Sequence, residues 1–244
     1  MPRVSARLSA LFPAGAVAVE MTAHGDPAGL LPAEVPAVAR AVAGRVREFA
    51  AGRRCARRAL AEFGVGDVAI AAAADRQPVW PPGMAGSITH TAGLCAAVVA
   101  PTRRLAALGL DCEVVGHVSA DIWDTICVAD EASWIDSLSA AGRPAAVALL
   151  FSAKEAFYKC QYPLAEEWLD FHDLRITPET WGTDSGAFRV SALRPLALSA
   201  TNPAPWVGRY LFHDGYVSTG ISLARYGCQD ENEAASKRCR PGTP

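Results

Sequence analysis

The 244-residue sequence lacks three features that would define its class at once. It has no apolar run of membrane-spanning length, its seven cysteines include no C-x-x-C pair, and its formal net charge is only −2. A membrane-spanning protein, a zinc or disulfide scaffold and a bulk electrostatic binder of nucleic acid are therefore not indicated. We expect a cytoplasmic protein with reduced thiols, no nucleic-acid partner and no membrane association.

Lysine is also scarce. Only three of the 23 basic residues are lysine, and two of them, Lys154 and Lys159, fall within six residues of each other. Because arginine is the usual cation of this chain, the pair indicates that a compact ammonium group is needed at that place.

The N-terminal segment has some features of a secretion signal, since Arg3 and Arg7 precede an apolar run. Pro13 and Gly15 interrupt that run, and Glu20 ends it. The pattern therefore favours a loop followed by a strand at 17–21.

The clearest helical pattern covers residues 34–63. Its apolar residues fall on one stripe at 100° per residue: Val38, Val42, Val46, Phe49, Ala56, Leu60 and Phe63. Four arginines lie opposite the stripe and are typical of a solvated face: Arg40, Arg47, Arg54 and Arg58. Arg45 and Arg53 fall within the stripe, and a buried guanidinium must be paired, either with a carboxylate or with an anionic ligand.

A second helix is predicted over 145–161, ending before Pro163. Glu155 lies on its apolar stripe, beside Phe151 and Tyr158. Strand patterns cover 87–90, 94–100, 105–115, 171–177, 186–193 and 206–224, whereas 116–143 has no clear pattern. The mixture indicates an α+β fold with strands and one long helix in each half.

Two acidic residues share one face of the strand at 105–115. Asp111 and Glu113 are separated by one residue, and side chains on a strand repeat with period two. With Glu155 they could form an all-oxygen pocket of the kind that Mg²⁺ takes. Taken alone, such an acidic pair is more often a solvated strand end.

The ordered set of motifs resembles the Sfp-type 4′-phosphopantetheinyl transferases, in particular the enterobactin-synthase-activating branch and its actinobacterial relatives. The resemblance rests on R-x-x-E-F-x-x-x-R-x-C-A-R at 45–57, RQPVWPPGMAGSITH at 76–90, GLDCE at 109–113, FSAKEAFYK at 151–159 and WLDF at 168–171.

The resemblance implies two similar α/β halves related by a pseudo-two-fold axis. The halves would span 1–106, with the arginine-bearing helix and the SITH segment, and 107–226, with the two acidic motifs. The polar tail at 227–244 is expected to be disordered.

The implied activity is that of a holo-[acyl-carrier-protein] synthase type of transferase. It would move the 4′-phosphopantetheine arm of coenzyme A to a serine of an apo acyl-, aryl- or peptidyl-carrier protein, with Mg²⁺, and release adenosine 3′,5′-bisphosphate. Fatty-acid, polyketide, nonribosomal-peptide and siderophore carriers all stay open as substrates. A monomer is the default, because the pseudo-dimer lies within one chain.

The resemblance also implies roles for single residues. Asp111, Glu113 and Glu155 would hold the metal, and Asp111, Glu155 and Lys159 would form the catalytic group, with Glu155 as a metal ligand, a general base or both. The coenzyme would be bound by Arg45, Arg53, Arg76, Ser87, Thr89 and His90, and its phosphates by Lys154 and Lys159. Lys154 could instead neutralise an adjacent carboxylate, and Trp168 could line the pantetheine channel or serve as a packing anchor.

Two departures and two alternatives complete these expectations. Cys112 occupies the middle of the D-x-E motif and should point away from it. The segment AAAAD at 71–75 lacks a lysine found in some relatives, so that a phosphate contact is either missing or passed to Arg76, and the group that meets the 3′-phosphate stays open. The same acids could serve a metal-dependent phosphohydrolase. The chain could also be a coenzyme A- or nucleotide-binding regulatory module without transferase activity.

Overall fold

The computed structural model describes residues 1–22 and 25–224. The tail predicted at 227–244 lies outside the described residues.

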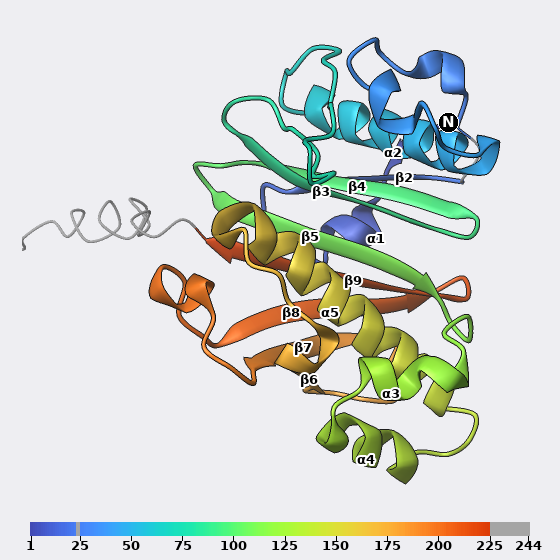
Figure 1. The fold of residues 1–244 in the computed structure, drawn as a ribbon, viewed down its shortest axis with the longest axis vertical. Helices are drawn as coiled ribbons and strands as arrows, with labels where there is room; N and C mark the ends of the chain where they lie inside the picture. The colour runs from blue at the N-terminus through green and yellow to red at the C-terminus, as the bar shows by residue number, and fades with distance from the viewer. Residues whose placement is uncertain (23–24, 225–244) are drawn as a thin grey trace, which may run out of the picture.

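Two antiparallel sheets form the framework (Figure 1). The first has the strand order β1-β2-β4-β3 and is built from β1 (Arg3–Val4), β2 (Val17–Met21), β3 (Met84–Thr91) and β4 (Leu94–Pro101). The second has the order β5-β9-β8-β7-β6 and is built from β5 (Leu105–Val114), β6 (Leu174–Pro178), β7 (Ser185–Ala192), β8 (Trp206–His213) and β9 (Tyr216–Ala224). The chain is thus a mixed α+β protein, as the strand and helix patterns predicted.

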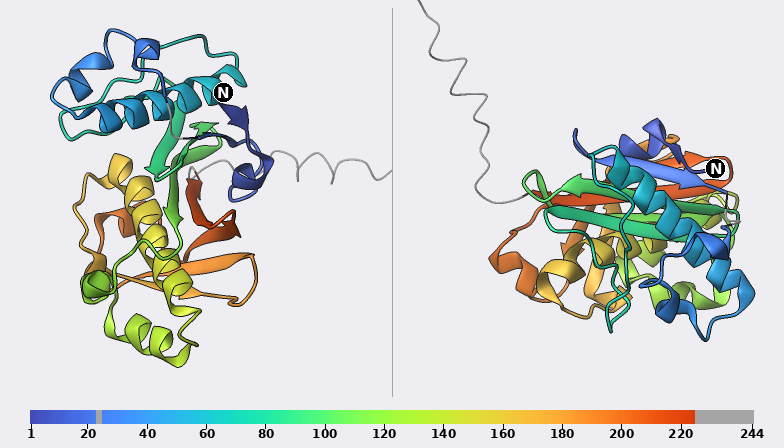
Figure 2. Two further views of the ribbon diagram at one scale, coloured as in Figure 1. Left: turned by 90° about the vertical axis from the view of Figure 1, so that its right-hand side faces the viewer. Right: turned by 90° about the horizontal axis from the view of Figure 1, so that it is seen from above.

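Each sheet carries one long helix. α2 (Ala43–Ala61) packs on the first sheet and α5 (Arg143–Ala165) on the second (Figure 2). The shorter helices are α1 (Ala6–Ser9), α3 (Trp123–Ile126) and α4 (Ala129–Ser137), with 3₁₀ turns at Pro27–Gly29, Val35–Val38, Ala120–Ile122, Phe171–Asp173 and Ala197–Ala200.

The two sheets share an apolar core on the face away from the long helices. Leu8 of α1 packs there with Val98 of β4 and with Leu108 and Leu110 of β5. This cluster joins the halves, because its residues come from both sheets.

Both long helices differ from their predicted ends. The first begins at Ala43 instead of residue 34, because Pro36 opens a separate 3₁₀ turn and Val42 is extended and 77% exposed. The second continues to Ala165, since Pro163 stands in its last turn, where few backbone hydrogen bonds remain to be lost. The segment 116–143, which has no clear sequence pattern, forms α3 and α4.

The strand predictions hold with small changes of boundary. The strand expected at 17–21 is β2, and the pattern at 206–224 is the hairpin β8–β9. Within the described residues, no helix is long and apolar enough to cross a membrane. The five described cysteines are all free and buried.

Candidate active site

The D-x-E motif lies on β5, where the alternation of side chains separates its three residues. Asp111 is 2% exposed and shares one side of the strand with Glu113. Cys112 points to the other side, into the core shared by the two halves, where its Sγ lies 3.0 Å from Oγ of Ser218. The thiol is therefore turned away from the acids, as the sequence predicted.

Lys159 of α5 reaches this acidic strand. Its Nζ donates to Oδ1 of Asp111 at 2.5 Å, and Oγ1 of Thr89 donates to the same oxygen at 3.0 Å. The second carboxylate oxygen, Oδ2, is buried and has no hydrogen-bond partner among the described residues. Asp111 thus uses one carboxylate oxygen for Lys159 and Thr89 and keeps the other, buried oxygen free of donors from the described part of the chain.

The charges around Lys159 are out of balance. Burial, together with the charge of the neighbouring Asp111, raises the pKa of Glu113 to about 7. Burial also raises the pKa of Glu155, with Lys159 opposing and Asp111 adding to the effect. Burial lowers the pKa of Lys159, but the carboxylates of Asp111 and Glu155 outweigh it, so the ammonium stays charged. Three acids therefore share one cation.

This imbalance fits a divalent cation, although the acids are not gathered into a cage. Among residues 1–22 and 25–224, no group of three His, Cys, Asp or Glu side chains converges closely enough to hold a metal ion. The free oxygen of Asp111 and the raised pKa values of the two glutamates are the features that an additional positive charge would satisfy. Oxygen donors of this kind suit Mg²⁺, which commonly takes a few carboxylates and fills its shell with phosphate and water.

A cavity of about 560 Å³ lies between α2 and α5, beside Lys159. Its charged and hydroxyl-bearing lining comes from both halves: Arg45, Glu48, Arg53, Asp75, Arg76, Ser87, His90 and Lys159. Four of these carry full positive charge at neutral pH, so the cavity favours an anionic ligand.

Arg53 is the most deeply buried of these cations, at 4% exposure. Its Nε donates to the carbonyl of Ile70 at 2.7 Å, and its guanidinium lies over the ring of Phe49, 4.1 Å from the centroid. Burial lowers its pKa to about 10. It forms no ion pair with any carboxylate of the described part of the chain. The sequence allowed either a carboxylate or an anionic ligand as the partner of Arg53, and an anionic ligand is the one that the structure leaves open.

Arg45 and His90 lie together at the cavity wall, beside Glu48. Nη1 of Arg45 contacts Nε2 of His90, and Oε2 of Glu48 lies 3.5 Å from each of them. Burial, with Arg45, lowers the pKa of His90. Arg45 is less buried than the helical projection predicted, since 47% of its side chain is exposed.

Arg76 and Ser87 also line this cavity, in different ways. Arg76 is exposed on the loop before β3 and adopts φ +73°, a left-handed conformation that is uncommon for arginine. Ser87 is buried, and its Oγ accepts from the backbone N–H of Leu110 at 3.1 Å. Thr89, by contrast, does not line the cavity, and its hydroxyl donates a hydrogen bond to Asp111.

An apolar pocket of about 330 Å³ adjoins the cavity on the side of Glu155. Tyr158 and Trp168 line both spaces, and their rings meet edge to face with centroids 5.7 Å apart. Trp168 is 74% exposed, so it forms an outer wall and is not a packing anchor.

The structure contradicts the expectation that Lys154 meets phosphate. Its side chain is 1% exposed, and Nζ donates to Oε2 of Glu131 at 2.7 Å and to the carbonyls of Ile126 and Phe171 at 2.7 and 2.9 Å. All three N–H donors are therefore used within the protein. Glu131, on α4, also accepts from the backbone N–H of Ile176 at 2.6 Å, so the pair joins α4, α5 and β6.

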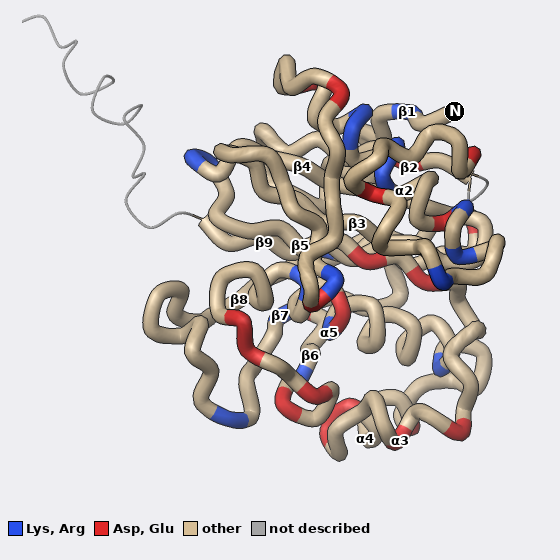
Figure 3. Tube along the Cα trace, turned by 45° about the horizontal axis from the view of Figure 1, so that its top comes forward, with Lys and Arg blue, Asp and Glu red and all other residues tan. Residues whose placement is uncertain are grey.

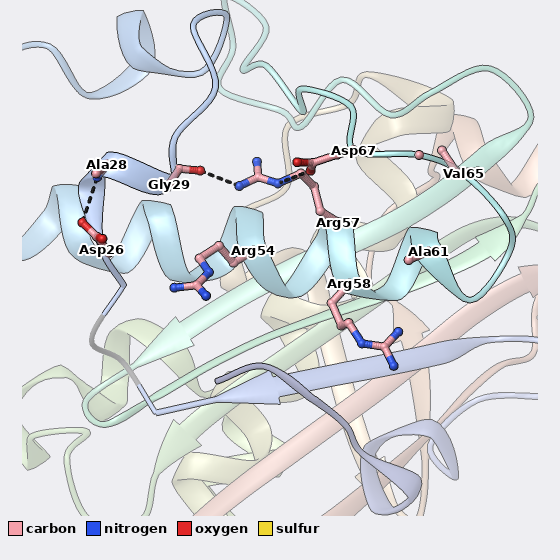
Figure 4. A pocket seen from close by; sticks show the side chains of 10 residues that line it. Asp26, Ala28, Gly29, Arg54, Arg57, Arg58, Ala61, Val65 and Asp67 are labelled. Atoms are coloured by element: carbon pink, nitrogen blue, oxygen red, sulfur yellow. Dashed lines mark hydrogen bonds and ion pairs between the residues drawn. The ribbon is translucent and has the colours of Figure 1, made fainter.

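The remaining arginines of α2 face away from the cavity. Arg54 and Arg58 line a separate pocket with Arg57 (Figure 4). Arg57 is paired with the fully buried Glu34, its Nη1 lying 2.6 Å from Oε1. Arg57 also donates to the carbonyl of Gly29, so it ties the segment before α2 to this helix, whereas Arg58 pairs with Glu62. The pocket that they line does not include Lys159.

Charge is distributed unevenly between the two parts of the chain (Figure 3). Residues 1–106 contain 12 Lys or Arg and 7 Asp or Glu, whereas residues 107–224 contain 7 and 15. Anions are therefore drawn toward the α2 side of the cavity, opposite the acids of β5 and α5.

Sequence reasoning missed several residues that shape this site. Thr91 donates to Oε2 of Glu113 at 3.4 Å, and its place two residues after Thr89 on one strand was a readable signal. Glu48 lies 3.5 Å from both Arg45 and His90; it is the acidic residue of the R-x-x-E-F motif, but no role was expected for it from the sequence. Glu131 lies in a segment without a clear pattern, and no sequence signal marks it as the partner of Lys154.

Comparisons with known proteins agree with this geometry. Residues 33–100 match the family model "4′-phosphopantetheinyl transferase N-terminal domain", and residues 107–206 match "4′-phosphopantetheinyl transferase superfamily". The chain is 34% identical over 223 residues to the 4′-phosphopantetheinyl transferase Npt of Nocardia iowensis, covering 89% of this chain and 100% of the relative.

Two further relatives widen the comparison. The 4′-phosphopantetheinyl transferase PptT of Mycobacterium tuberculosis is 37% identical over 207 residues, covering 82% of this chain and 89% of that protein. Enterobactin synthase component D of Salmonella typhi is 39% identical over 122 residues, about half of each chain. These matches show that the chain belongs to the 4′-phosphopantetheinyl transferase superfamily.

Proposed function

We propose that this protein transfers the 4′-phosphopantetheine arm of coenzyme A to a serine of an apo acyl-, aryl- or peptidyl-carrier protein. The serine oxygen forms a bond to the phosphorus that carries pantetheine, the bridging P–O bond of the pyrophosphate breaks, and adenosine 3′,5′-bisphosphate leaves. The observation that carries this proposal is the cavity with four cations in its lining, one of which, Lys159, is bonded to Asp111. The cavity shares Tyr158 and Trp168 with the neighbouring pocket that Glu155 lines.

The coenzyme would lie with its phosphates on the α2 side of the cavity. Arg53 supports this role because its buried guanidinium has no carboxylate partner within the described residues. Arg45, Arg76 and His90 would bind the remaining anionic groups, Arg76 taking the 3′-phosphate. The apolar pocket walled by Tyr158 and Trp168 would hold the pantetheine arm.

Asp111, Glu113 and Glu155 would hold Mg²⁺, which would neutralise the charge of the pyrophosphate. Lys159 would contact the phosphate that is transferred with the pantetheine arm, since the carboxylates of Asp111 and Glu155 keep its ammonium charged. Glu155 would accept the proton of the serine hydroxyl. Burial raises its pKa, and a carboxylate with a raised pKa is a stronger base.

A mixing experiment tests the proposal. The purified protein is incubated with apo carrier protein, coenzyme A and Mg²⁺, and the carrier is weighed by intact-mass spectrometry. Transfer predicts a mass gain of one phosphopantetheine group. Cleavage of coenzyme A without a carrier would indicate a phosphohydrolase, and binding of coenzyme A without either reaction would indicate a regulatory module.

A panel of carriers would define the substrate range. Fatty-acid, polyketide, nonribosomal-peptide and siderophore carriers should be compared by kcat/KM under one set of conditions. We expect a monomer in solution, because both sides of the cavity come from one chain, and gel filtration with light scattering would test this.

A further inference from the structure

Three hydroxyl side chains recur at every second residue of β3 and contact β5. Ser87 accepts from the N–H of Leu110 at 3.1 Å, Thr89 contacts the next residues of β5, and Thr91 donates to Glu113 at 3.4 Å. The strands β3 and β5 belong to different sheets and share no backbone ladder. These hydroxyls therefore link the two halves along the strand that carries the D-x-E motif.

Thr89 has the most constrained hydroxyl of the three. It is 1% exposed, and its Oγ1 accepts from the backbone N–H of Cys112 at 3.2 Å while it donates to Oδ1 of Asp111 at 3.0 Å. Because the N–H of Cys112 occupies one lone pair, the hydroxyl proton is free to point at the carboxylate. The donor is thus fixed by the backbone of the same strand that carries its acceptor.

The consequence for Asp111 is an unequal use of its two oxygens. Thr89 and Lys159 both donate to Oδ1, whereas Oδ2 is buried and has no partner among the described residues. The two donors approach from different halves of the protein, so together they define how the carboxylate plane is turned.

We propose that Thr89 is a positioning residue: by donating to Oδ1 it holds the Asp111 carboxylate so that Oδ2 stays free to bind a divalent cation. This inference rests on the proposed function, because it assumes that a divalent cation binds at these acids. It departs from the expectation that Thr89 binds the coenzyme itself. Residues that orient a metal ligand commonly change metal affinity by about 10- to 100-fold when they are replaced.

The test compares variants that keep or remove the hydroxyl. Thr89→Val removes it at nearly constant volume, and Thr89→Ser keeps it. Mn²⁺ is the probe, and its dissociation constant is measured by electron paramagnetic resonance with coenzyme A present. Binding of coenzyme A is measured separately, by calorimetry without a divalent ion. We expect Thr89→Val to weaken Mn²⁺ binding about 10- to 100-fold and Thr89→Ser to change it by less than about threefold.

Thr219→Val is the matched control. Thr219 is also buried and lies opposite Asp111 in the β5–β9 register, but its Oγ1 donates to the carbonyl of Ser152. It should leave Mn²⁺ binding within about threefold of the wild type, as expected for a hydroxyl that does not orient the ligand. If Thr89→Val does not fold, Thr89→Cys gives the same comparison, because a thiol is a weak donor.

Two results would overturn the inference. Mn²⁺ binding by Thr89→Val that equals the wild type would show that the hydroxyl does not position Asp111. A loss of coenzyme A affinity in the metal-free measurement as large as the loss for Mn²⁺ would assign Thr89 to the coenzyme. A wild-type protein that binds no Mn²⁺ would instead overturn the proposed magnesium site, and the inference with it.

Discussion

The ammonium of Lys159 lies 2.5 Å from Oδ1 of Asp111 and joins the C-terminal part of α5 to the acidic strand β5. Lys154, on the same helix, is enclosed with Glu131 instead. The two lysines that stand out in the sequence therefore have different roles, one at the cavity and one inside the protein.

Lys154→Met should destabilise the protein instead of weakening coenzyme binding. The change leaves Glu131 buried without its cation, which typically costs about 3–5 kcal/mol. Thermal or urea unfolding measures the effect. Adding Glu131→Leu should recover only part of the loss, because the N–H of Ile176 then loses its acceptor. A normal melting temperature with a raised KM for coenzyme A would instead indicate that Lys154 contacts a phosphate of the coenzyme.

Helical geometry could have distinguished the roles of Lys154 and Lys159 from the sequence alone. Residues 155 and 159 lie on one helix face, four positions apart, whereas residue 154 is turned by about 100° from residue 155. The partner of Lys154 could not be foreseen, because Glu131 is 23 positions away on an element without periodicity.

Other parts of the site follow the sequence more closely. The separation of Cys112 from the two acids follows from the period of a strand, and the burial of Arg53 follows from the period of a helix. The hydrogen bond from Thr89 to Asp111 depends on how the two sheets pack together, and no local sequence pattern predicts that packing. The late start of α2 depends on Pro36, whose preference for the first turn of a short helix outweighed the apolar periodicity.

Lys159→Arg should reduce transfer although it keeps the charge. The wider guanidinium cannot occupy the position of a compact ammonium between Asp111 and Glu155 without moving one of them. We expect kcat to fall about 10- to 100-fold, and Lys159→Ala to lose more. Transfer rates at saturating coenzyme A measure this. Full activity in Lys159→Arg, with an unchanged KM, would show that only a charge near the end of the helix is needed.

Arg53→Ala should raise the KM for coenzyme A. Loss of a charge-assisted contact to phosphate costs about 2 kcal/mol, or roughly thirtyfold in KM. Arg47→Ala is the control, since this exposed arginine of α2 does not line the cavity, and it should leave KM unchanged. A lower melting temperature in Arg53→Ala with a normal KM would make Arg53 a structural residue.

Glu113 should make the metal-free protein less stable as pH rises. Its pKa is about 7 in the folded protein against an ordinary value of 4.5, so the folded state holds an extra proton between these values. The associated stability is fully present below pH 4.5 and is lost as pH rises through about 7. Glu113→Gln removes the charge and should raise the free energy of unfolding by about 1–2 kcal/mol at pH 8, after allowance for solvent screening.

The comparison needs a second pH and a chelator. At pH 4.5 the same variant should match the wild type, because Glu113 is then protonated in the folded protein. Urea unfolding with EDTA at both pH values measures the difference. Equal stability of the two proteins at pH 8 would show that the carboxylate is not strained by burial.

Glu155→Gln tests the account most directly. The amide keeps the size of the side chain but can neither accept the proton of the carrier serine nor contribute charge to a cation site. Wild-type protein and variant are incubated with apo carrier, coenzyme A and saturating Mg²⁺, and the intact mass of the carrier is followed over time. The account predicts a phosphopantetheine mass gain with the wild type and none with Glu155→Gln, whose melting temperature stays within a few degrees of the wild type. Transfer by the variant at a rate close to the wild type would contradict it.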